Sequence, residues 1–167
     1  LTIGVPLFNN LIADNRLLSE VFALRATLSN ARTEALTQRS FVTVCRSSDG
    51  ASCTGNWNQG YIAFTDLDGD GTLDPNGPGG DKIIQAQVLA HSTLDITYSN
   101  GANRVRFNSR GNAIGFSGTI KICDQRGATE ARGMSVANVG SVQALVDSDN
   151  PKDGIVNFQG GSNVTCP

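Results

Sequence analysis

The 167-residue sequence contains few of the residues that enzymes use for catalysis. It has one histidine, His91, and none of the Gly-x-Ser-x-Gly, phosphate-loop or His-Glu-x-x-His motifs. A lone histidine between Ala90 and Ser92 is more often a surface or turn residue than a general base, and we interpret His91 in that way. The sequence therefore favours a protein without enzymatic activity, required cofactor or small-molecule substrate.

Long apolar runs and a strong net charge are also absent. The apolar opening at residues 1–8 is much shorter than the roughly 18 residues of a membrane-spanning helix, and we interpret it as the end of a longer apolar segment. The net charge of −2 and the pI of about 5.2 do not favour a chain that coats nucleic acid or anionic membranes. The hydrophobic and charged contents, 39% and 17%, are those of a globular protein, and we expect one domain over residues 1–167.

The four cysteines, Cys45, Cys53, Cys123 and Cys166, indicate the cellular compartment. They form no Cys-x-x-Cys pair, and one histidine adds little to a zinc site. Two disulfides in an oxidising compartment are favoured, with four reduced cysteines in a cytosolic protein as the alternative. Of three possible connectivities we predict Cys45–Cys53 and Cys123–Cys166, since each pairs a strand end with a loop or tail that follows it.

Residues 6–39 are predicted to form one long helix. Its apolar residues recur at spacings of four and three, as on one face of a helix, and Leu18 and Phe22 are expected to widen this stripe. The stripe consists of Leu17, Val21, Leu24, Leu28, Ala31 and Ala35. Such a helix is roughly 45–50 Å long, so its N-terminal part should project beyond a small domain. The side chains expected to stay available for neighbouring molecules are Leu7, Phe8, Leu11 and Ile12.

After Ser40 the apolar residues recur with the period of two that is typical of strands. A long helix followed by antiparallel strands is an α+β arrangement, and residues 40–167 should form a β-rich head with a C-terminal tail. The predicted strands are residues 41–45, 60–64, 82–88, 93–98, 104–107, 119–123, 134–137 and 142–146.

A loop rich in Asp and Gly follows the second predicted strand. Its acidic residues have the spacing of a calcium-binding loop, although Gly77 stands where the last, bidentate carboxylate belongs, and Asp81 could replace it only if the loop bends differently. We therefore predict a weak calcium site, with a solvated acidic turn as the alternative. Its expected ligands are Asp66, Asp68, Asp70, Thr72 and Asp74.

Basic residues gather in the second half of the chain, and we interpret them as a solvated outer face of the sheet. Two of them, Arg104 and Arg106, alternate with apolar residues and should share one sheet face. The full set is Arg104, Arg106, Arg110, Lys121, Arg126 and Arg132.

Seven short motifs, in this order and spacing, resemble the GspH/FimT family of minor pilins and pseudopilins over roughly residues 5–145. They are Asn15–Leu17, Ala31–Ala35, Val42–Ser47, Trp57–Asp66, Phe107–Gly111, Gly118–Asp124 and Ala131–Val136. The resemblance implies a type IV pilin-like fold, a long N-terminal helix packed on antiparallel β-sheets. It also implies that about half of that helix precedes Leu1, lying in the inner membrane of a Gram-negative bacterium before assembly and in the fibre afterwards.

The resemblance implies a structural minor pilin of a type IV pilus, which helps to initiate or cap the fibre. Its partners would be other minor pilins and the major pilin, with the head in the periplasm before assembly and outside the cell afterwards. The alternatives are an H-type pseudopilin of type II secretion, a FimT-type DNA receptor and, from a different class, an extracellular calcium-regulated adhesin head. DNA-binding members carry a Gly-Arg-x-Arg motif where this chain has Gly140, Ser141 and Gln143, so we expect no nucleic-acid binding.

Overall fold

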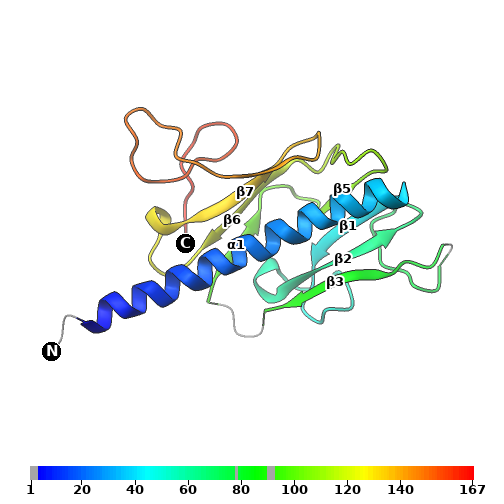
Figure 1. The fold of residues 1–167 in the computed structure, drawn as a ribbon, viewed down its shortest axis with the longest axis horizontal. Coiled ribbons are helices and arrows are strands. Elements are labelled where there is room, and N and C mark those ends of the chain that lie inside the picture. Colours follow the sequence, from blue (N-terminus) through cyan, green and yellow to red (C-terminus); the bar gives the residue numbers. More distant parts are fainter. Residues whose placement is uncertain (1–3, 78, 90–92) are drawn as a thin grey trace.

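The computed structural model describes residues 4–77, 79–89 and 93–167, and its first element is a helix of 35 residues, α1 (Gly4–Gln38). The helix runs along the whole molecule, and its N-terminal part extends beyond the sheets (Figure 1). It begins two residues before the predicted start and ends one residue before the predicted end. His91 and the side chain of Leu7 lie outside the described part of the chain.

The face of α1 that packs against the sheets is the stripe predicted from the sequence. All six of its members are buried: Leu17, Val21, Leu24, Leu28, Ala31 and Ala35. Among the described residues, no helix combines the length and the apolar character needed to cross a membrane.

The first sheet has four antiparallel strands in the order β3-β2-β1-β5. They are β1 (Phe41–Arg46), β2 (Gly60–Asp66), β3 (Ile83–Val88) and β5 (Arg104–Phe107). Between β1 and β2 lies the short 3-10 helix η1 (Trp57–Gln59). The register pairs Phe41 with Asp66, so the end of β2 lies beside the start of β1.

The second sheet is also four-stranded and antiparallel, in the order β4-β6-β7-β8. Its strands are β4 (Asp95–Tyr98), β6 (Gly118–Cys123), β7 (Arg132–Val136) and β8 (Val142–Ala144), with the 3-10 helix η2 (Ala128–Glu130) between β6 and β7. One helix packed on two antiparallel sheets is the predicted α+β architecture.

The main core lies between α1 and both sheets. Val44 and Phe107 come from the first sheet, Ile120 and Met134 come from the second, and all four are fully buried. Since removing apolar surface from water is the main favourable contribution to folding, this shared core holds the helix and the two sheets together.

Two disulfides are present, in the predicted connectivity. Cys45 at the end of β1 is joined to Cys53 in the following loop, and Cys123 at the end of β6 is joined to Cys166 in the C-terminal tail. The second bond has a sequence separation of 43 and should stabilise the fold by about 3–4 kcal/mol. It lies in a small separate cluster with Ala131, Val156 and Val164, so the tail has its own buried apolar contacts.

Candidate assembly surface and acidic loop

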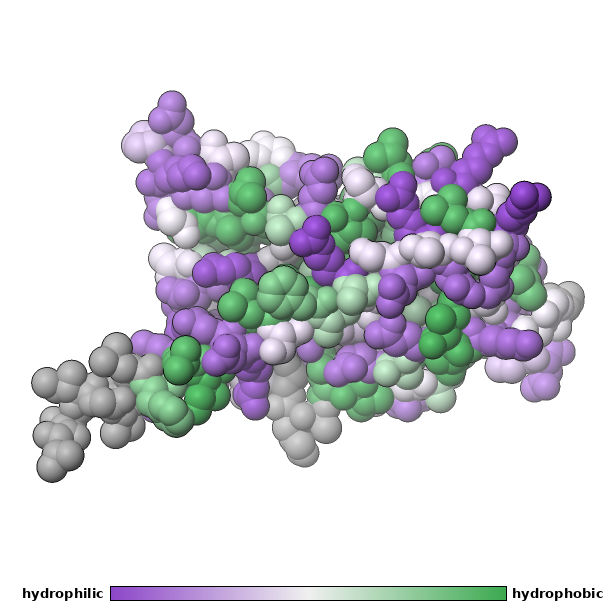
Figure 2. All heavy atoms as spheres, viewed as in Figure 1, coloured by the Kyte–Doolittle hydropathy of each residue, from purple (hydrophilic) through white to green (hydrophobic). Residues whose placement is uncertain are grey.

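The protruding part of α1 carries large apolar side chains that the head does not cover. Phe8, Leu11 and Ile12 are 63%, 56% and 51% exposed. Figure 2 shows green, hydrophobic spheres on the protruding end of the molecule, beside the grey residues. Three of the four residues selected from the sequence are thus exposed, while the side chain of Leu7 is not described.

The same surface continues toward the head through Leu18 and Phe22, which are 41% and 63% exposed. The prediction that these two residues widen the buried stripe was wrong. Each follows a buried stripe residue directly, and one residue turns a helix by about 100°, which carries the side chain out of the interface. The sequence signal that could have revealed this is a second series of apolar residues with helical spacing, which lies on a different side of the helix from the first.

Four of these residues form what we term the exposed stripe: Phe8, Leu11, Leu18 and Phe22. Their separations of three, seven and four residues place them on one side of α1. The helix therefore has one apolar face buried against the head and a second apolar face in solvent. Exposed apolar side chains grouped on one side of a helix in this way are typical of interaction sites.

An ion pair joins the N-terminal half of α1 to the second sheet. Arg126, in the turn after β6, contacts Asp14 of the helix and Asp124, each at 2.6 Å. Although burial alone would raise the pKa of Asp124, its hydrogen bonds with Arg126 hold that pKa below its ordinary value. Arg126 therefore positions the helix, and the prediction that it lies on a solvated face was wrong.

The acidic loop, which we define as residues 66–81 between β2 and β3, brings three of the predicted calcium ligands together. Carboxylate oxygens of Asp66, Asp68 and Asp70 all lie within 4.8 Å of one another. Asp68 and Asp70 are exposed, whereas Asp66 is fully buried. One oxygen of Asp66, Oδ2, accepts a hydrogen bond of 2.6 Å from the hydroxyl of Thr43, and the other, Oδ1, has no partner.

The other end of the loop folds back, so that Asp81 supports it from within. Its buried carboxylate accepts hydrogen bonds from the backbone N–H groups of Leu67 at 3.0 Å and Asp74 at 3.3 Å. The hydrogen bond with Asp81, burial and the charges of Asp81, Asp68 and Asp70 raise the pKa of Asp74. Asp74 thus lies beside Asp81 and outside the group of three, and Thr72 donates its N–H to Asp70 at 2.6 Å.

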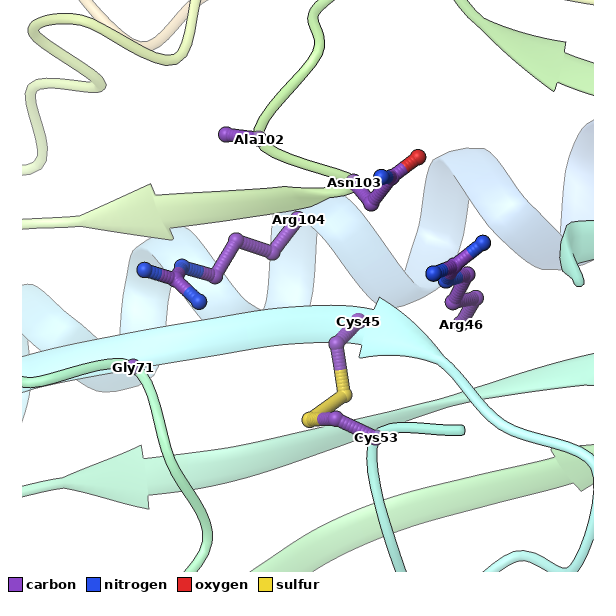
Figure 3. Close-up of a pocket in the computed structure, with 7 residues that line it drawn as sticks. All are labelled: Cys45, Arg46, Cys53, Gly71, Ala102, Asn103 and Arg104. Carbon is purple, nitrogen blue, oxygen red and sulfur yellow. A yellow bond between two sulfur atoms is a disulfide. The ribbon is translucent and has the colours of Figure 1, made fainter. Parts of the chain in front are cut away.

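Arg104 and Arg106 of β5 lie against the acidic loop, and Arg106 is hydrogen-bonded to its backbone. Arg106 lies with its guanidinium carbon 5.3 Å from the ring centre of Phe41 and 5.0 Å from that of Phe116, and it donates to the carbonyl of Gly69. Arg104 extends from β5 toward Gly71, where a Cβ atom would lie 2.6 Å from its Nε (Figure 3). Both arginines are half-buried, so their assignment to a solvated face was also wrong.

Gly140, the glycine of the DNA-binding motif position, has a packing role in this chain. Its φ is +78°, and a Cβ there would lie 1.8 Å from the carbonyl oxygen of Gly111. Arg32 of α1 donates to the same carbonyl at 3.0 Å and to the carbonyl of Val139 at 3.2 Å. The close approach of two turns to the helix thus explains why glycine is required at this position. The glycine alone is therefore no sign of a DNA-binding motif.

Comparison with known proteins places this fold among pilin-like proteins. The family model described as "Type II transport protein GspH" matches residues 20–140. Crystal structures of the type IV minor pilin FimU of Pseudomonas aeruginosa in two crystal forms match with a TM-score of 0.59 each. Identity is 22% and 21%, with 81% and 80% of this chain and 92% and 95% of the FimU chains covered. Comparison with curated proteins gives no match.

Proposed function

The chain belongs to the family of the type II transport protein GspH, whose members are structural pilin-like proteins rather than enzymes, and on this basis we propose that it is a minor pilin of a type IV pilus. Its role in this proposal is to help initiate or cap the fibre by packing α1 among the helices of other minor pilins and the major pilin. Before assembly the head lies in the periplasm with the helix anchored in the inner membrane, and afterwards it belongs to the extracellular fibre of a Gram-negative bacterium.

The exposed stripe is the observation that carries this proposal. Phe8, Leu11, Leu18 and Phe22 leave apolar area in water on the side of α1 that faces away from the head. Helices that bury such stripes against one another gain about 25 cal/mol for every Å² removed from water. The stripe therefore supports helix packing with neighbours rather than a role of the head alone.

A pseudopilin of type II secretion is the second candidate, since the description of the matching family names type II transport. The structural match to FimU, a type IV minor pilin, covers nearly all of the FimU chain. This match supports the pilus as the first candidate. Deleting the gene in its own bacterium separates the two: loss of surface fibres supports the pilus, and loss of protein secretion with intact fibres supports the pseudopilin.

The helix-packing role can be tested with the protein as expressed in its own bacterium. The substitutions Leu11→Ser and Phe22→Ser should together abolish co-purification with other pilins while the protein level is unchanged. Ile114→Ser is the matched control, because Ile114 is 67% exposed but lies outside the helix, and it should leave co-purification unchanged. Full co-purification of the Leu11→Ser/Phe22→Ser variant would contradict the proposal.

A further inference from the structure

Asp66 is an exception to the rule that buried polar atoms have hydrogen-bond partners. The residue is fully buried at the end of β2, and its Oδ1 atom has no partner. Leaving a buried carboxylate oxygen unsatisfied costs free energy, since it has lost its water and gained nothing in return. The carboxylate of Asp66 also lies next to those of Asp68 and Asp70, and the two observations together indicate a missing positive ligand.

No basic side chain of the described residues supplies that positive charge. All the ion pairs found in the described part of the chain involve Arg126. This residue lies in the turn after β6, in the second sheet, whereas Asp66 ends a strand of the first sheet. The nearby Arg106 donates to a backbone carbonyl, and Arg104 packs against the backbone at Gly71. Three carboxylates are thus held together without a protein cation within ion-pair distance.

From this geometry we propose that the acidic loop binds one calcium ion through Asp66, Asp68 and Asp70. The three ligands are all oxygen atoms, which suit a hard cation. Two ligands at about 2.3–2.6 Å from one calcium ion can be at most about 5 Å apart. The three carboxylates lie within 4.8 Å of one another, which is close enough for one ion to reach all of them. Because Asp68 and Asp70 are exposed, water can supply the remaining oxygen ligands. Calcium takes six to eight oxygen ligands in a flexible arrangement, whereas magnesium requires a strict octahedron, so this site favours calcium.

A second acidic group, Asp147, Asp149 and Asp153 in the tail, lacks the feature that distinguishes the first. The buried polar side chain beside it, Asn157, is hydrogen-bonded at both its oxygen and its nitrogen. This group therefore supplies a matched control, with the same number of carboxylates lying within the same distance of one another.

The site would link the calcium concentration around the protein to the stability of the first sheet. Asp66 ends β2, and the loop that it begins leads to the edge strand β3. Three protein carboxylates and water suggest a Kd of about 10⁻⁴–10⁻³ M, in the range of extracellular calcium modules. This inference does not depend on the proposed assembly role.

Calorimetric titration of calcium chloride into the chelator-treated protein tests the site directly. We expect one ion per chain, and a Tm increase of about 3 °C or more at ten times the Kd. Asp70→Asn should weaken binding at least tenfold and remove most of the Tm increase, whereas Asp149→Asn should bind like the unsubstituted protein. Asp70 is exposed, so its variant should keep the fold, which circular dichroism checks.

Three results would overturn the inference. The first is neither heat nor a Tm increase at about 10 mM calcium. The second is binding that persists in Asp70→Asn and in Asp66→Asn but is lost in Asp149→Asn. The third is equal stabilisation by magnesium and calcium, which would indicate general screening of the loop by divalent ions.

Discussion

Glu20 is a carboxyl group on the buried side of α1, where only 7% of the residue is exposed. Burial raises its pKa above the ordinary value of 4.5, although the hydroxyl of Tyr61 donates a hydrogen bond of 3.0 Å to it. Because the pKa is higher in the folded than in the unfolded protein, the protonated form favours folding. That contribution is complete below pH 4.5 and is lost as the pH rises through the folded pKa.

Glu20→Gln should therefore stabilise the protein at neutral pH, because the amide keeps an oxygen for Tyr61 without burying a charge. We expect a gain of about 1 kcal/mol in unfolding free energy at pH 7 and almost none near pH 4. Denaturant unfolding at both pH values measures this difference. Tyr61→Phe is the matched control and should destabilise the protein at pH 7, since it removes the donor; equal gains for Glu20→Gln at both pH values would contradict the ionisation argument.

At the scale of secondary-structure elements, α1 has two apolar faces with different roles. Leu24 is fully buried, whereas Phe22, two residues earlier, is 63% exposed. Leu24→Ala should lower the unfolding free energy by about 2–5 kcal/mol, and Phe22→Ala should change it by no more than about 0.5 kcal/mol. Thermal or urea unfolding of both variants checks this contrast, and a loss above 2 kcal/mol in Phe22→Ala would show that the exposed stripe is part of the core.

The elements could be predicted from the sequence because their patterns are local. Period-two alternation located the eight strands of the described residues to within a few residues, and the main stripe of α1 identified its buried face. The exposed face of Leu18 and Phe22 was missed because two apolar series overlap on one helix. The half-buried state of Arg106 was missed since it depends on Phe41 and Phe116, which the fold brings to it from distant parts of the sequence.

The acidic loop shows the same division between local and distant information. The spacing of Asp66, Asp68 and Asp70 predicted that their carboxylates would gather, and they do. Only the fold shows that Asp66 is buried with an unpartnered oxygen and that Asp81 returns to support the loop. Both facts depend on the pairing of β2 with β1 and β3, which no short motif specifies.

At the scale of the whole molecule, the charge distribution does not favour nucleic acid. The net charge is −2, and the guanidinium groups of Arg32, Arg106 and Arg126 are engaged by carbonyls or carboxylates of the protein itself. Since non-specific affinity comes mostly from neutralising phosphates, we predict a Kd for duplex DNA weaker than about 10⁻⁴ M at physiological salt.

Fluorescence anisotropy with a labelled duplex at about 150 mM salt measures this affinity. The variant Ser141→Arg/Gln143→Arg, which restores the two basic residues of the family's DNA-binding motif, should bind more tightly than the unsubstituted protein. Micromolar binding by the unsubstituted protein that is lost in Arg104→Ala/Arg106→Ala would instead support the DNA-receptor alternative.

The bond between Cys123 and Cys166 turns the last part of the chain into a covalent ring. A protease that cuts the ring once, for example after the exposed Lys152, opens the backbone without releasing either piece. On a non-reducing gel the cut protein should therefore migrate near its full mass, and a C-terminal fragment should separate only after reduction. A protein built in this way keeps its tail after a single proteolytic cut and loses it only when the disulfide is also broken.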